Sequence, residues 1–148
     1  MPPYVAVVGP GEATSEEIAT AEEVGRLLAE RGAVLVCGGL GGVMEAACRG
    51  AREGGGMTVG ILPGSDRAAA NPHVDVAIAT GLGEARNALV VRAADVVIAV
   101  GGAYGTLSEI ALALKTGTPV VGIRSWELAG RPLKEARDAR EAVELALG

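Results

Sequence analysis

The chain has 148 residues, enough for one domain with a single hydrophobic core. Hydrophobic residues make up 49% and the mean hydropathy is +0.36, which excludes a disordered chain, and no apolar run reaches the ~20 residues that a membrane-spanning helix needs. With a net charge of −5 and an aromatic content of 2%, the chain offers neither a basic surface nor a base-stacking platform, so nucleic acid is not expected as a partner.

Apolar runs alternate with helical patterns along the chain. The runs are rich in Val and Ile and nearly continuous, as is typical of strands buried on both faces of a sheet. The predicted strands span residues 5–8, 34–37, 58–62, 74–79, 96–100 and 120–123, and the predicted helices span residues 15–31, 42–53, 84–93, 104–116 and 133–147. This alternation predicts one α/β domain over residues 1–148, a Rossmann-like doubly wound parallel sheet of about six strands with helices on both faces.

Capping signals support several of these boundaries. Thr14 or Ser15 can cap the first helix, and Glu17 is placed for a capping-box contact to Thr14. Gly117 ends the fourth helix, and Pro119 follows shortly after it. Pro132 is expected in the first turn of the last helix, a position that tolerates proline.

Glycine-rich loops follow three of the strands and fall at the carboxyl edge of the sheet, where ligands of open α/β sheets bind. Glycine lets a backbone approach a ligand closely, but it also serves tight turns and close helix packing, and both interpretations apply here. The candidate ligand-binding residues are Gly9, Gly11, Gly39, Gly41, Gly42, Met44, Gly101, Gly102, Gly105 and Thr106.

Known nucleotide and metal motifs are incomplete. Gly9-Pro10-Gly11 lacks the third glycine of GxGxxG, because position 14 is Thr, and the next strand ends without an acidic residue for a ribose diol. No GxxxxGK(S/T) segment is present, which argues against a P-loop kinase or ATPase. The single histidine, His73, and the two cysteines, Cys37 and Cys48, do not have metal-ligand spacing, so no metal site is expected.

The segment from Val100 to Glu109 carries the strongest chemical signal. Its glycines lie between a buried strand and a helix start, where free N–H groups and the helix dipole favour an anion. Thr106 either caps this helix or binds a phosphate, and Glu109 either complements the dipole or takes part in chemistry. Arg86, at the same edge of the sheet, is either an exposed surface residue or a ligand for phosphate or carboxylate.

The helix after Gly105 is apolar on more than one face. Leu112 and Ala113 are expected opposite its core face, which predicts that this helix packs in a homodimer. Glu109 is expected to lie off the core face. The residues expected to form that core face are Leu107, Ile110, Ala111 and Leu114.

Several of these residues together resemble a known family. Arg86, Asp95 at the start of the next strand, Gly101-Gly102 and the run Gly105-Thr106-Leu107-Ser108-Glu109 resemble the motifs of Lonely Guy-type phosphoribohydrolases, also labelled lysine-decarboxylase-like. The resemblance covers roughly residues 4–123. The segment GGAYGTLSEIALALK is similar to a smaller bacterial branch that includes molybdenum-cofactor-carrier-like proteins.

The resemblance implies two functions. The wider family implies hydrolysis of a nucleoside 5′-monophosphate to free base and ribose 5-phosphate, with Arg86 and Glu109 in the catalytic positions, Gly101, Gly102, Gly105 and Thr106 around the phosphate, and no required cofactor. The carrier-like branch implies binding of a nucleotide or pterin-type cofactor phosphate without turnover. The family also supports a homodimer or higher homo-oligomer.

Two further expectations concern the reaction class and location. Lysine decarboxylation through pyridoxal needs a lysine at the site, and Lys115 and Lys134 are both expected in helices away from the glycine loops. No basic segment ahead of an apolar stretch opens the chain, so a cytoplasmic location is expected.

Overall fold

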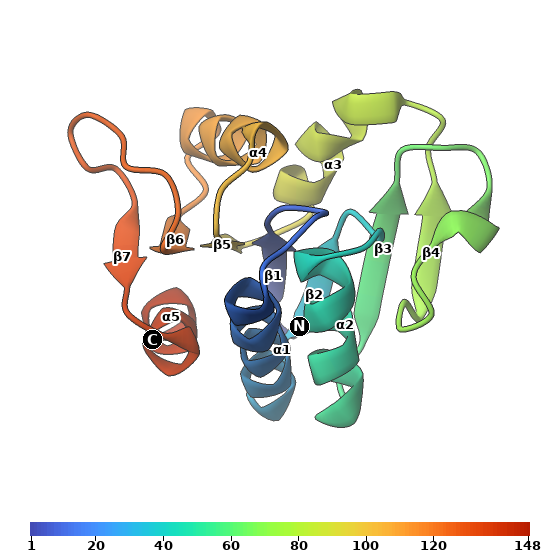
Figure 1. Ribbon diagram of the computed structural model, residues 1–148, viewed down its shortest axis with the longest axis horizontal. Helices are drawn as coiled ribbons and strands as arrows, with labels where there is room; N and C mark the ends of the chain where they lie inside the picture. Colours follow the sequence, from blue (N-terminus) through green and yellow to red (C-terminus); the bar gives the residue numbers. More distant parts are fainter.

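Seven parallel strands form the centre of the computed structural model, which describes residues 1–148 (Figure 1). The strands are β1 (Tyr4–Val8), β2 (Val34–Cys37), β3 (Thr58–Leu62), β4 (Val76–Ala79), β5 (Val96–Val100), β6 (Val120–Ile123) and β7 (Lys134–Ala136). Their order in the sheet is β4-β3-β2-β1-β5-β6-β7, so the chain winds outward in both directions from β1 and β5. The doubly wound fold is confirmed, with one strand more than expected.

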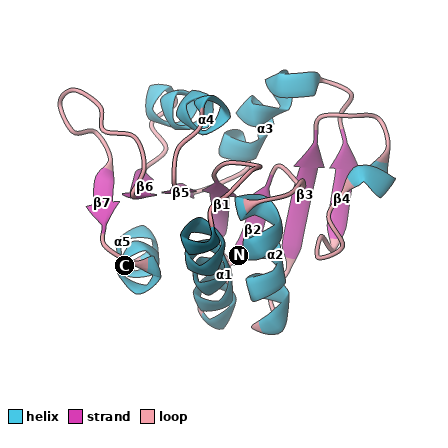
Figure 2. Ribbon diagram, viewed as in Figure 1, coloured by secondary structure: helices cyan, strands magenta, loops and turns pink.

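Five α-helices cover the two faces of this sheet, and their arrangement can be followed in Figure 2. They are α1 (Ser15–Glu30), α2 (Val43–Glu53), α3 (Arg86–Arg92), α4 (Tyr104–Lys115) and α5 (Ala139–Leu147). A core of 23 buried residues joins α1, α2 and α5 to one face, and a core of 12 joins α3 and α4 to the other. Both faces of β1 and β5 are therefore apolar, which explains the continuous hydrophobic runs in these central strands.

The start of α1 forms as its sequence predicts. The Thr14 hydroxyl accepts a hydrogen bond of 3.1 Å from the Glu17 N–H, and the Glu17 carboxylate accepts one of 2.9 Å from the Thr14 N–H. This reciprocal capping box satisfies two backbone donors at the end of β1's loop, so it fixes where α1 begins relative to the sheet. None of the helices combines the length and apolar character of a membrane span.

The C-terminal region differs from the prediction. The expected helix over 133–147 is wrong in its first part, because β7 pairs with β6 there and α5 begins only at Ala139. Asp138 caps α5 by accepting a 2.9 Å hydrogen bond from the Glu141 N–H, and Pro132 precedes β7 instead of opening a helix. Two of the three residues in β7 are charged and exposed, as is common in edge strands, so the segment lacks a strand-like hydropathy pattern.

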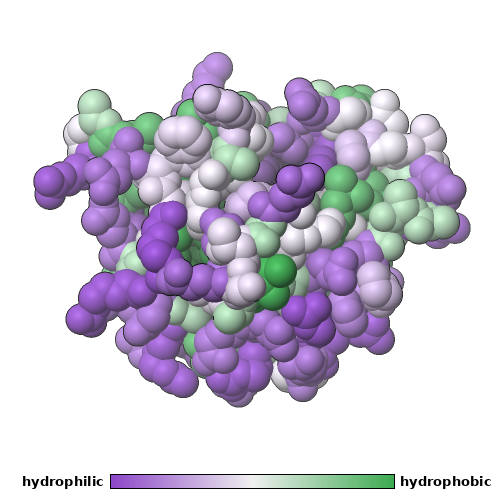
Figure 3. Space-filling view, in the orientation of Figure 1, coloured by the Kyte–Doolittle hydropathy of each residue, from purple (hydrophilic) through white to green (hydrophobic).

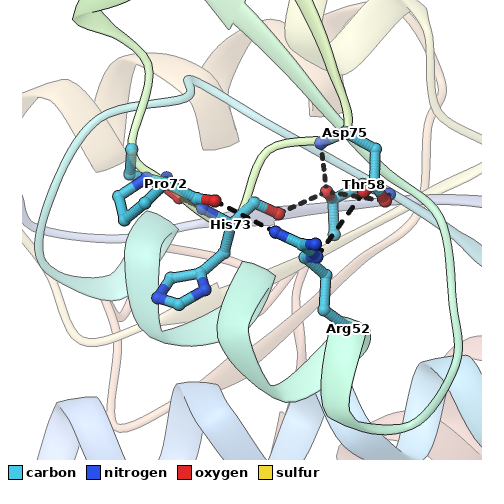
Figure 4. A network of polar contacts seen from close by, with 6 residues as sticks. Arg52, Thr58, Pro72, His73 and Asp75 are labelled. Atoms are coloured by element: carbon cyan, nitrogen blue, oxygen red, sulfur yellow. Dashed lines mark hydrogen bonds and ion pairs between the residues drawn. The ribbon is translucent and has the colours of Figure 1, made fainter.

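A polar network anchors the connection between β3 and β4 (Figure 4). The Arg52 guanidinium, from α2, donates a 3.0 Å hydrogen bond to the Pro72 carbonyl, and the Thr58 hydroxyl donates one of 2.7 Å to the His73 carbonyl. The Asp75 carboxylate accepts a 2.9 Å hydrogen bond from the Thr58 N–H. These contacts use backbone atoms of His73 and not its imidazole.

Candidate functional site

A cleft of about 360 Å³ opens at the carboxyl edge of the sheet, and we call it the carboxyl-edge cleft. It lies where the loop after β1 meets the N-terminal ends of α3 and α4. Figure 3 shows many hydrophilic side chains over α1 and α2 in the lower part of the view, and a mixture of hydrophilic and intermediate residues around the loops at this edge. The lining residues are Gly9, Pro10, Gly11, Met44, Pro63, Gly83, Glu84, Arg86, Asn87, Ala103, Gly105, Thr106 and Glu109.

A larger hollow of about 690 Å³ lies at the opposite, amino edge of the sheet, beside both chain termini. It is mostly apolar, and its one carboxylate, Asp95, already accepts a 2.9 Å hydrogen bond from the Tyr4 N–H. The carboxyl-edge cleft is therefore the better candidate for chemistry, because it contains polar groups that the fold leaves unpaired.

Glu109 is a buried acid in the cleft wall. Its side chain comes from the second turn of α4, and the residue is only 8% exposed. Burial raises the pKa of Glu109 from 4.5 to about 7, and the positive charge of Arg86 opposes part of that rise. A carboxyl group that changes protonation state near neutral pH in a cleft is typical of a functional site.

The buried face of α4 differs from the one predicted. It consists of Thr106, Glu109, Ile110 and Ala113, while Ala111 is exposed. Only Ile110 was expected there. The hydropathy pattern misplaces this face because the cleft next to the first turns accepts polar side chains on the inner side of the helix. Ala113 packs in the core and the half-buried Leu112 packs against it, so neither of the two residues that suggested the homodimer forms a free outer face.

Arg86 is the first residue of α3, and its guanidinium packs against the glycine that follows β2. A methyl group on Gly38 would lie 1.7 Å from Nη1 of Arg86, so only glycine leaves room for this arginine. The Arg86 Nε is buried without a hydrogen-bond partner. Burial lowers the pKa of Arg86, while the negative charge of Glu109 opposes part of this decrease. The result is a half-buried cation with an unused donor, which is what an anionic ligand requires.

Thr106 presents a second unused polar group. The residue is 2% exposed, and its hydroxyl has no hydrogen-bond partner. It does not cap α4, because the N-cap residue is Ala103 and no side chain caps this helix end. The first amides of α4 are thus without a side-chain acceptor, and the helix dipole at this end favours negative charge. Together these groups form a candidate anion site.

The structure brings together seven of the twelve predicted site residues. Arg86, Glu109, Gly9, Gly11, Met44, Gly105 and Thr106 all line the cleft. Gly105 has open space around its Cα, as an approaching ligand needs, and a methyl group on Gly9 would lie 2.5 Å from the Val100 carbonyl. Gly9 thus serves close packing of β1 against β5 as well as the cleft.

The other five predicted glycines do not line the cleft. Gly42, with φ of 65°, brings α2 against the first loop, since a methyl group there would lie 2.3 Å from the Pro10 carbonyl. Gly41 is near the same loop, and Gly101 and Gly102 pack against side chains of Glu17 and Trp126. Gly39 packs on Leu62, and Asn71 holds its loop through a 2.9 Å hydrogen bond to the Gly39 carbonyl. These glycines shape the loops that the ligand would meet.

Sequence reasoning missed several lining residues. Glu84 and Asn87 flank Arg86 at the start of α3, and Pro63 follows β3 at the same edge. All three residues follow a strand, and this position was the available signal for the cleft. Their residue types alone do not indicate a chemical role without the tertiary structure. Gly38 was not singled out either, although the Arg86 guanidinium packs against it.

Comparison with known proteins agrees with this architecture. The molybdenum cofactor binding protein of Rippkaea orientalis superposes with a TM-score of 0.93 and 41% identity, covering 98% of this chain and 95% of that chain. The molybdenum cofactor carrier protein of Chlamydomonas reinhardtii gives a TM-score of 0.88 at 35% identity, covering 98% and 96%.

One curated relative carries the name of a phosphoribohydrolase. A probable cytokinin riboside 5′-monophosphate phosphoribohydrolase of Oryza sativa subsp. japonica is 36% identical over 104 residues, which is 68% of this chain and 42% of the rice protein. The chain thus spans less than half the length of that relative. The profile of the SLOG cluster4 family matches residues 2–146. Because this match covers almost the whole length, the chain belongs to the SLOG cluster4 family.

Proposed function

We propose that the protein binds a small phosphorylated ligand in the carboxyl-edge cleft and hydrolyses the N-glycosidic bond of a nucleoside 5′-monophosphate. The observation that carries this proposal is that the half-buried Arg86 and the buried Glu109 share the wall of one cleft beside the uncapped start of α4. The rice relative, named as a probable phosphoribohydrolase, supports the reaction class.

The 5′-phosphate would bind at the start of α4. The first amides of that helix and the Thr106 hydroxyl are donors without side-chain partners, and the absence of a side chain at Gly105 lets a phosphate approach the backbone. The Arg86 guanidinium adds a positive charge at the other wall of the cleft. These groups explain how a protein of net charge −5 can attract an anion.

Glu109 would act at the anomeric carbon. In the reaction, water attacks C1′, the C1′–N bond breaks, and its electron pair leaves with the base, which is protonated. The transition state carries oxocarbenium character, which a nearby carboxylate stabilises, and the same carboxylate can accept a proton from the attacking water. Because Glu109 has a pKa of about 7, hydrolysis should increase as pH rises through neutrality.

A second candidate function is binding of a pterin-type cofactor phosphate without turnover. It is favoured by the solved structures that cover nearly all of this chain, which are named as molybdenum cofactor binding and carrier proteins. Arg86 and the start of α4 would serve such a ligand equally well. Glu109 would then contribute to shape and charge and not to a chemical step.

One experiment separates the two functions. The full chain is incubated with AMP, and free adenine and ribose 5-phosphate are quantified by chromatography. Hydrolysis predicts both products, and Glu109→Gln should abolish them while AMP still binds. Ligand-dependent thermal stabilisation without product would support the carrier function, and full activity of Glu109→Gln would refute the catalytic assignment.

A further inference from the structure

The connection between β6 and β7, residues 124–133, reaches across the edge of the sheet to the start of α4. Trp126 in this connection donates a 3.0 Å hydrogen bond from Nε1 to the Ala103 carbonyl. Gly102 packs on the same indole, since a methyl group there would lie 2.9 Å from Nε1. Trp126 therefore contacts two of the three residues that lead from β5 into α4.

We propose that Trp126 is a positioning residue, which holds the Gly102–Ala103 turn so that the first amides of α4 face the anion. The proposal rests on the proposed phosphate site and adds a part of the chain that does not line the cleft. In a trans peptide the C=O and N–H point in opposite directions. The Ala103 carbonyl is held by two donors, the Trp126 indole and the Leu107 N–H at 3.0 Å, so the Tyr104 N–H points out of the helix end.

The indole is itself held in place. Its ring stacks on Tyr104 with centroids 6.1 Å apart and an interplanar angle of 29°. At the start of the connection, Arg124 has φ of 47°, an unusual conformation for a non-glycine residue. Its guanidinium forms an ion pair of 3.1 Å with Glu16 and donates a 2.8 Å hydrogen bond to the Thr20 hydroxyl. The connection is thus fastened to α1 before it reaches Trp126.

The stacked pair of Trp126 and Tyr104 lies outside the cleft, so it can position the site without touching the ligand. Tyr104 is 84% exposed and is absent from the cleft wall, whereas its neighbours Ala103 and Gly105 line it. Neither ring lines the cleft, so removal of the stack should change the direction of backbone donors without removing a ligand contact.

The test uses the full chain and isothermal titration with ribose 5-phosphate. Trp126→Phe keeps a ring that can stack on Tyr104 but removes the N–H donor, and we expect the Kd to rise by about three- to tenfold, as for one hydrogen bond. With AMP as substrate, KM should rise by a similar factor and kcat should change less, because Arg86 and Glu109 are unaltered. Ala129→Ser, an exposed position in the same connection, is the matched control and should bind like wild type.

If wild type binds ribose 5-phosphate and Trp126→Phe binds equally well, the positioning role is refuted and the proposed function stands. If wild type binds neither ribose 5-phosphate nor AMP, the proposed function and this inference both fail.

Discussion

Glu109→Gln should stabilise the protein at alkaline pH and much less at acidic pH. Because burial raises the pKa of Glu109 from 4.5 to about 7, the folded protein holds this proton more tightly than the unfolded chain does. Stability should therefore fall as pH rises from 4.5 to 7. Each pH unit between the two values contributes about 1.4 kcal/mol, so the ionised carboxylate lowers the free energy of unfolding by about 3 kcal/mol above neutrality.

The assay is urea unfolding followed by circular dichroism. At about pH 5 the Glu109 carboxyl should destabilise the wild-type protein only a little, and at about pH 9 it should do so to nearly the full extent. The quantity of interest is the difference in unfolding free energy between Glu109→Gln and wild type at each pH. Glu84→Gln, an exposed position in the same cleft wall, is the control and should show no such pH dependence. An equal gain for Glu109→Gln at both pH values would refute the claim that burial dominates at this carboxyl.

Three further substitutions test the geometry of the cleft. Gly38→Ala should displace the Arg86 guanidinium, because the new methyl group would lie 1.7 Å from Nη1, and AMP hydrolysis should fall at least tenfold. Gly41→Ala is the control: its methyl group would lie 3.8 Å from the nearest atom, so this variant should retain the fold and most of the activity. Gly105→Ala has free space and should raise thermal stability, by about 0.5–1 kcal/mol from helix propensity, yet weaken ribose 5-phosphate binding in calorimetry. Thr106→Val removes a buried, unpartnered hydroxyl, so unfolding experiments should show no loss of stability, while phosphate affinity should fall about tenfold; unchanged affinity would place the anion elsewhere.

The regular elements follow from local sequence. β2, β3, β5 and β6 have the predicted bounds because buried parallel strands require continuous apolar runs, and such runs are visible without any tertiary information. The capping box of Thr14 and Glu17 is equally local. β7 was missed for the complementary reason, since an edge strand of charged residues takes its conformation from pairing with β6 and not from its own pattern.

By itself, the sequence determined the alternation of strands and helices, the edge at which ligand-binding loops gather, and two residues with suitable chemistry, Arg86 and Glu109. Only the tertiary structure decided that these two share one cleft, that Gly38 makes room for the arginine, and that Trp126 holds the turn before α4. The physical reason is range: hydrophobic periodicity and capping act over a few neighbouring residues, whereas desolvation, steric room and hydrogen-bond satisfaction depend on segments that meet only after the sheet has formed.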